Sequence, residues 1–178
     1  MSIILYLITI VVANLSTVMF NPTVVGILVI PPSAYFMGFT FILGNLIQDK
    51  FGTKVSRICI WLGLVLSSIM CFVLDFSQFI VIASALAFLV SQYVTNILYK
   101  LLSKTSKNAN LTSSLIGSVL DVTLFVTIGL SPIGINTVPW NQLIFAIIGQ
   151  LIVQTLLQLI ASKLLDKFYK GGKSINES

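Results

Sequence analysis

Asp121 is the residue of this sequence with the most evident chemical potential, because it stands inside a long apolar segment. Residues 111–130 carry no other charged side chain. An ionisable side chain at the centre of a membrane helix costs about 2.5–3.5 kcal/mol on insertion scales. Such a carboxyl group could bind donor groups of a solute or carry a proton at mid-membrane. Alternatively, a protonated carboxyl group could tie two helices together by hydrogen bonds.

Amide side chains recur in the other apolar segments at helical spacing. Glutamines at 150, 154 and 158 are four residues apart, which places them on one face of a helix. An amide offers a donor and an acceptor, which suits a neutral solute with mixed hydrogen-bonding edges. As an alternative, each amide could link two helices, at about 0.6 kcal/mol each. The candidate lining of a polar pocket is Asp121 with Asn14, Asn45, Gln92, Gln150 and Gln154.

An aromatic cluster follows the adjacent prolines Pro31 and Pro32. It contains Phe39, on which a planar solute would stack, although rings of this kind in a membrane helix usually contact lipid or pack against other helices. Adjacent prolines are accepted in the first turn of a helix but not inside one. A short helix therefore begins near Ser33, and its positive end makes residues 31–33 a candidate margin of the site.

The composition places all these residues in a membrane. The 178 residues are 57% hydrophobic and 8% charged, with a mean hydropathy of +1.04. Soluble domains carry about 25% charged residues, so a soluble enzyme is excluded. The chain has no histidine and two cysteines, which excludes a metal or haem centre built from these residues. We expect no enzymatic activity and no cofactor.

Uncharged apolar runs predict an all-α bundle of six transmembrane helices. The bundle forms one domain over residues 1–162, followed by a basic tail at 163–178. The segment 23–30 before the second helix is apolar and β-branched, and its entry into the membrane is left open. Charged linkers are expected at 49–57 and 100–107. The six helices are predicted at 3–20, 33–48, 58–74, 77–99, 111–130 and 143–162.

The ten basic residues indicate the orientation of the chain. With the N-terminus inside and six crossings, all ten face the cytoplasm, as the positive-inside rule requires. Both termini are therefore predicted to be cytoplasmic. Because the basic residues fall in short clusters between apolar runs, we expect the lipid bilayer and a small molecule as partners, and no nucleic acid. A homo-oligomer is left open.

Several short motifs resemble the signature of the vitamin uptake transporter (VUT) family, whose members are also known as queuosine precursor transporters. The main motif is Asn-Leu-Ile-Gln-Asp-Lys-Phe-Gly at 45–52, preceded by Pro32 and followed by Arg57. Residues 83–92 and 113–125 resemble the fourth and fifth helices of the family, and the whole resemblance covers residues 14–130. It implies six helices in the bacterial inner membrane and import of a 7-deazapurine, a queuosine precursor, by secondary transport.

The same resemblance assigns roles to particular residues. It makes Asn14, Asn45, Gln92 and Asp121 site residues, and it makes Asp49 and Arg57 coupling or gating residues. Two positions depart from the signature, because Asn45 and Thr95 stand where the family commonly has Asp. A 7-deazaguanine presents adjacent N–H and NH2 donors, which the carboxylate of Asp121 could accept in a bidentate way.

Two other functions fit a small six-helix membrane protein. One is the substrate-binding subunit (S-component) of an energy-coupling-factor vitamin importer, which needs an ATPase partner. Such subunits usually carry Ala-x-x-x-Ala on the first helix, whereas here Ala13 is followed by Ser16 and Thr17. The other is a holin-like pore former, against which the intramembrane Asp121 argues mildly.

Overall fold

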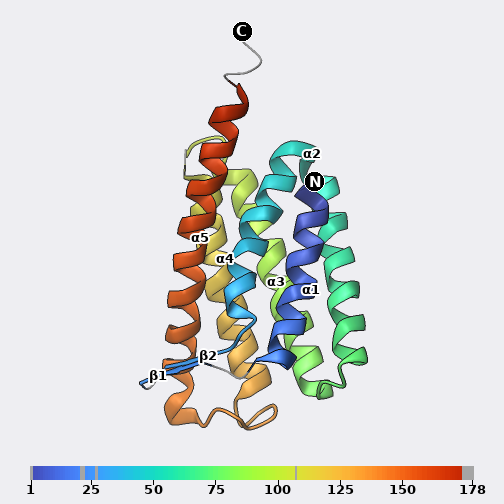
Figure 1. Cartoon of the computed structure of the whole chain (residues 1–178), viewed down its shortest axis with the longest axis vertical. Coiled ribbons are helices and arrows are strands. Elements are labelled where there is room, and N and C mark those ends of the chain that lie inside the picture. The colour runs from blue at the N-terminus through green and yellow to red at the C-terminus, as the bar shows by residue number, and fades with distance from the viewer. Residues whose placement is uncertain (1, 21–22, 27, 107, 174–178) are drawn as a thin grey trace.

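Five long helices run side by side in the computed structural model (Figure 1), which describes residues 2–20, 23–26, 28–106 and 108–173. In hydrocarbon a helix satisfies all its backbone hydrogen bonds internally, so long apolar runs adopt this form. The structure thus confirms the predicted all-helical class, apart from one short hairpin. The helices are α1 (Ser2–Met19), α2 (Ala34–Val73), α3 (Gln78–Leu102), α4 (Ala109–Phe125) and α5 (Leu143–Lys173).

The length and apolar composition of four helices allow them to cross a membrane. These are α2, α3, the segment Ala109–Leu130 and the segment Trp140–Leu164, while Ser2–Thr17 is a shorter apolar helix. The segments fall on the predicted apolar runs, except that the runs predicted at 33–48 and 58–74 are both part of α2.

The helix α2 consists of two helical segments that meet at Gly52. This glycine has φ 84° and ψ 167°, a conformation that is essentially restricted to glycine. Figure 1 shows α2 rising through the bundle, turning at the end where the N-terminus lies, and descending again. The charged linker predicted at 49–57 is therefore wrong. One glycine suffices to reverse the chain, so the charged residues on both sides of it stay helical.

A π-helical turn, η1 (Val126–Leu130), continues α4 and leads into a tightly folded loop. The Ile135 N–H donates to the Gly129 carbonyl at 3.0 Å, and the Val138 N–H donates to the Leu130 carbonyl at 2.9 Å. The 3-10 turn η2 (Trp140–Gln142) then starts α5. π-Helical turns occur frequently at functional sites, and this one directly follows the helix that carries Asp121.

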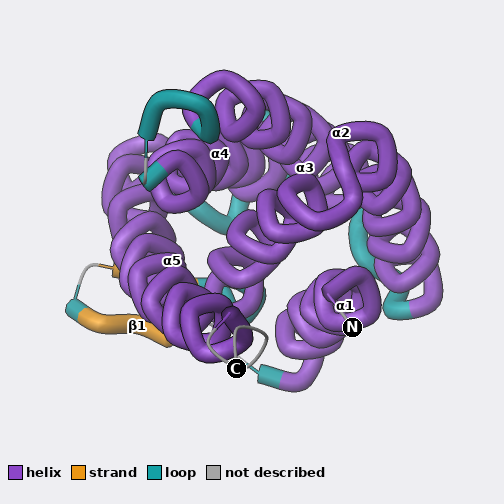
Figure 2. The backbone as a smooth tube through the Cα atoms, turned by 90° about the horizontal axis from the view of Figure 1, so that it is seen from above, coloured by secondary structure: helices purple, strands orange, loops and turns teal. Residues whose placement is uncertain are grey.

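The segment 23–30 forms a small antiparallel hairpin of β1 (Thr23–Val25) and β2 (Leu28–Ile30). Thr23 pairs with Ile30 and Val25 with Leu28, and Gly26 supplies the positive φ of 61° at the turn. The hairpin lies outside the helix bundle beside α5 (Figures 1 and 2). It stands at the end of the bundle away from the N-terminus, which we call the loop end; we call the other end the terminal end.

The last helix is longer than the sequence analysis predicts. It continues past residue 162 to Lys173, since the leucine and lysine residues that follow Ser162 are good helix formers. The basic tail predicted at 163–178 is therefore helical at its start, and residues 174–178 lie outside the described part of the chain.

We expect Gly52→Ala to destabilise the fold by about 1–3 kcal/mol, because a side chain is strained in this backbone conformation. Thermal unfolding of the purified protein in detergent measures the effect. The matched control is Lys54→Ala, an exposed position with ordinary helical backbone, which should change stability by no more than about 0.5 kcal/mol. Equal melting temperatures for the two variants would contradict the role of Gly52.

Candidate functional site

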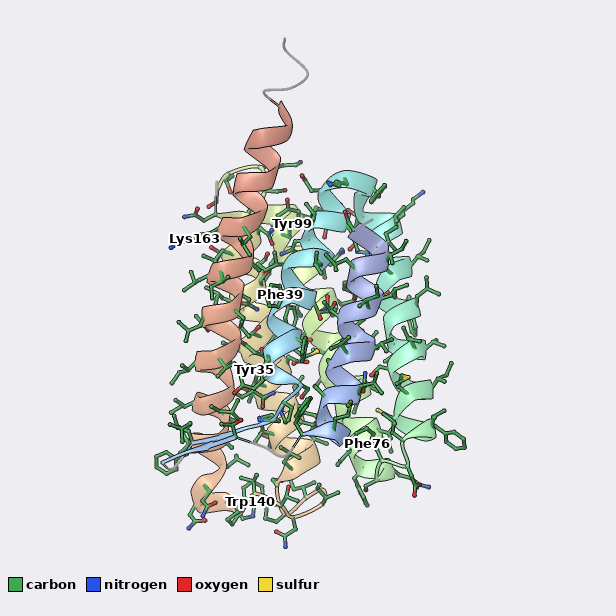
Figure 3. The ribbon with its side chains drawn as sticks, in the orientation of Figure 1. Tyr35, Phe39, Phe76, Tyr99, Trp140 and Lys163 are labelled. Atoms are coloured by element: carbon green, nitrogen blue, oxygen red, sulfur yellow. The ribbon has the colours of Figure 1, made fainter. Side chains whose placement is uncertain are left out.

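A cavity of about 380 Å³ lies between the helices and reaches the loop end of the bundle. This volume is within the range of about 300–1,000 Å³ that is typical of small-molecule sites. Near the loop end the cavity is lined by Pro31, Phe76 and Thr137, and deeper in the bundle by Asp121 and Gln150. Figure 3 shows Phe76 and Trp140 at this end and Tyr99 and Lys163 at the other.

One polar corner of the cavity is formed by Asp121 of α4 and Gln150 of α5. The two side chains are 5% and 3% exposed, and the Ser91 hydroxyl of α3 donates to Asp121 Oδ1 at 3.3 Å. The Oε1 atom of Gln150 has no hydrogen-bond partner among the described residues. This corner therefore presents several oxygen acceptors to a ligand.

The other polar corner comes from α1 and the second segment of α2. The Asn14 amide donates to the Ile10 carbonyl at 2.9 Å and to the Ser67 hydroxyl at 3.2 Å, and the Cys71 thiol lies 3.5 Å from Asn14 Oδ1. Asn14, Ser67 and Cys71 all line the cavity. The cavity thus has polar groups on two different walls and apolar side chains between them.

The aromatic rings that line the cavity are Phe76, Phe88 and Phe125. The predicted stacking residue, Phe39, is half-buried on α2 and does not line the cavity, although Met37 from the same turn does. Phe125 stands four residues after Asp121 and therefore shares its helix face, a signal that the sequence analysis missed. Phe76 lies in the turn after α2, where spacing carries no such information.

Asn45 lies outside the cavity lining and connects two helices. Its side chain is 1% exposed and ties the first segment of α2 to α4 near the terminal end. Its Nδ2 atom lies within hydrogen-bond distance of four oxygens of α4: Asn110 Oδ1 at 2.9 Å, Asn110 O at 3.2 Å, Ser113 Oγ at 2.8 Å and Ser114 Oγ at 3.0 Å. The geometry of Asn45 is that of a helix link.

The predicted gating residues lie near Gly52 at the terminal end. Gln48 and Asn96 form two hydrogen bonds with each other, at 2.6 and 3.0 Å. Arg57 Nε donates to Asn96 Oδ1 at 3.4 Å, and its guanidinium lies 5.7 Å from the centroid of the Tyr93 ring, a cation–π distance. Asp49 is exposed close by. Arg57 thus belongs to a polar network that joins both segments of α2 to α3.

Gln92 and Gln154 are buried, at 2% and 0% exposure, and neither lines the cavity. Both amide atoms of Gln154 and the Nε2 atom of Gln92 have no hydrogen-bond partner among the described residues. Gln154 lies one helical turn beyond Gln150 toward the terminal end.

The start of α2 borders the cavity as predicted, since Pro31, Pro32 and Ser33 line it. Its first N–H groups, however, are used locally: Ala34 donates to the Pro31 carbonyl at 3.0 Å and Tyr35 to the Pro32 carbonyl at 3.2 Å. This segment therefore contributes shape to the site, while its first N–H groups are already paired.

The described residues contain no group of three or more His, Cys, Asp or Glu side chains that could hold a metal ion. The chemistry that the cavity offers is hydrogen bonding and ring stacking.

We expect Asn45→Ala to lower thermal stability by about 1 kcal/mol, with about 1.7 kcal/mol as the upper limit for such links in membranes. Asn110→Ala should cost a similar amount, and the double variant less than the sum, because the two residues share one interaction. Unfolding of the four proteins in detergent measures this coupling. Strictly additive losses would show that Asn45 does not link α2 to α4 through Asn110.

Comparison with known protein families matches the chain to the family model described as "Putative vitamin uptake transporter". It covers residues 72–165, more than half of the chain. The matched part contains α3, α4 and most of α5, including Asp121 and Gln150. None of the curated proteins and none of the solved structures matches the chain.

Proposed function

This chain belongs to the vitamin uptake transporter family, as its motifs predict, and from that premise we propose that it imports a small, planar, neutral solute by secondary transport. We propose a 7-deazapurine precursor of queuosine as the substrate. The observation that carries the proposal is a cavity between apolar helices with Asp121 on its wall.

The size and lining of the cavity favour a fused-ring solute. A volume of about 380 Å³ suits a molecule of one or two rings better than a long chain. Phe88 and Phe125 offer faces or edges for ring stacking, which is worth about 0.5–1.5 kcal/mol beyond the buried area. The polar groups stand at two corners, so a bound molecule needs polar edges separated by an apolar body.

The corner of Asp121 and Gln150 favours a donor edge on the solute. A 7-deazaguanine carries an N–H and an NH2 group side by side, which matches the two oxygens of a carboxylate. The unpartnered Oε1 of Gln150 offers a further acceptor, on a residue that also lines the cavity. On the other wall, the hydrogen-bonded group of Asn14, Ser67 and Cys71 supplies polar contacts for the opposite edge of the ring system.

We further propose that the chain crosses the bacterial inner membrane six times with both termini in the cytoplasm. The six crossings are α1, the two segments of α2, α3, α4 with η1, and α5. In support, Lys50, Lys54 and Arg57 flank the Gly52 turn, and Lys100 and Lys163 lie at the same terminal end. The cavity then reaches the outer surface, which suits the uptake of a solute from outside.

Uptake into liposomes tests the proposed function. The purified protein should accumulate labelled 7-deazapurine in a saturable way, and Asp121→Asn should lower uptake by about 10- to 150-fold, since a hydrogen bond to a charged group is worth about 1.5–3 kcal/mol. Asp75→Asn makes the same chemical change outside the cavity lining, at a position with a φ of 55° that Asn tolerates, and should leave uptake intact.

Two results would contradict this proposal. Undiminished uptake by Asp121→Asn would remove that carboxyl group from the mechanism. Uptake that requires a co-purified ATPase complex would assign the chain to the energy-coupling-factor importers instead.

Ligand binding can be tested without transport. A solute that binds the folded form stabilises it, by about 2.7 kcal/mol at 100 times its dissociation constant. In a thermal-shift panel of purines and 7-deazapurines in detergent, we expect bases with adjacent N–H and NH2 groups to raise the melting temperature. Analogues that lack the exocyclic NH2 group should have a smaller effect. Equal shifts for both groups would contradict recognition of the donor edge.

A further inference from the structure

Among the residues that the structure describes, the unpaired buried polar atoms concentrate on one face of α5. The described residues contain six buried side-chain nitrogen and oxygen atoms without a hydrogen-bond partner, and four of them belong to Gln150, Gln154 and Gln158. A buried unpaired group costs about 1–3 kcal/mol, and such groups are rare in proteins. Their concentration on one helix face therefore calls for a partner that enters this region.

The facing side of α4 is polar along the same length. Asp121, Ser118, Ser114 and Asn110 follow one another at intervals of three or four residues and so share one face. From α5, Gln158 Nε2 donates to Ser118 Oγ at 2.5 Å and to the Ser114 carbonyl at 3.3 Å. A polar seam thus connects the cavity to the terminal end, over about 16 Å at 1.5 Å per residue.

Two other inter-helix seams are filled. Tyr6, Ile10 and Phe88 belong to an apolar cluster that joins α1, α2 and α3. At the junction of α2, α3 and α4, the ring of Phe41 is fully buried, and a Cβ atom at Gly117 would lie 3.0 Å from it. The two remaining unpaired atoms, on Tyr6 and Gln92, lie apart from the α5 face, on the side of α2 next to Gly44.

We propose that the seam between α4 and α5 is the inner half of the transport route, and that Gln154 forms a second binding position for the solute along it. This inference rests on the proposed function. Gln154 suits the task because it lies one turn inward of the cavity-lining Gln150 and has both a donor and an acceptor without partners. Gln158 and Ser118, which are bonded to each other, close the seam on its inner side.

Because the Gln154 side chain has no hydrogen-bond partner among the described residues, a substitution there can test transport without disturbing the fold. Gln154→Leu breaks no hydrogen bond of the described structure and removes two unpaired atoms, so the folded protein should keep or gain thermal stability. Because the outer cavity is unchanged, the apparent affinity for a 7-deazapurine, measured by thermal stabilisation, should stay within twofold of that of the unmodified protein. Uptake into liposomes should fall at least tenfold.

Two matched controls accompany this variant. Gln48→Leu makes the same substitution at an amide that is paired with Asn96 through both its atoms, and it should lower the melting temperature. Leu156→Ala changes an exposed residue on the outer face of α5 and should leave uptake within twofold.

A second measurement does not depend on the leucine substitution. Ser114→Cys places a thiol in the seam, and a membrane-impermeant maleimide applied from the terminal side should label it several-fold faster when 7-deazapurine is present. Ser16→Cys, at a buried position of α1 away from the seam, should show no such dependence.

The outcomes distinguish the two proposals. The proposed route would be wrong if Gln154→Leu shows normal uptake, or if the labelling rate of Ser114→Cys does not change when the solute is added. Neither result would contradict the proposed function. Loss of thermal stability or of ligand stabilisation in Gln154→Leu would assign Gln154 to the fold or to the outer cavity, and would also overturn the route. If the unmodified protein neither binds nor imports any solute of the panel, the proposed function fails and the route fails with it.

Discussion

The structure depends on the requirement that polar groups inside a membrane bundle find partners within the protein. The helix α4 supplies partners to polar side chains from three neighbouring helices. It receives Asn45 from α2, it binds Ser91 from α3 through Asp121, and it accepts the Gln158 amide from α5 at Ser118. Each of these bonds requires its two partners to lie side by side, so together they favour one register of the packed helices.

Paired and unpaired groups are unevenly distributed along the bundle. At the terminal end, Gln48, Asn96 and Arg57 form a connected network around the Gly52 turn, and Asn45 holds α2 against α4. Toward the loop end the helices enclose the cavity, where Gln150 keeps an unpaired oxygen. The bundle is thus joined by polar contacts at the terminal end and holds its cavity toward the loop end.

Some of the site could be predicted because its signal is local. A single carboxyl group in an apolar run identifies Asp121, and spacing of four places Gln150 and Gln154 on one face. Asn45 and Gln150 look alike in the sequence, however, and their surroundings differ: four oxygens of α4 surround the first, while the second borders the cavity. Phe39 was the prediction for stacking, whereas Phe88 and Phe125 line the cavity, because the sequence does not reveal which helix face meets which neighbour.

The sequence by itself determined the membrane class, the apolar segments, the side on which the basic residues gather and the family. All of these follow from hydropathy, charge and motifs that are read along the chain. Only the tertiary structure decided that Gly52 alone reverses α2, that segment 23–30 is a hairpin, and that Asn14 shares a corner with Ser67 and Cys71. The physical reason is that backbone hydrogen bonds form helices from local sequence, while a cavity arises where side chains from distant helices fail to fill the space between them.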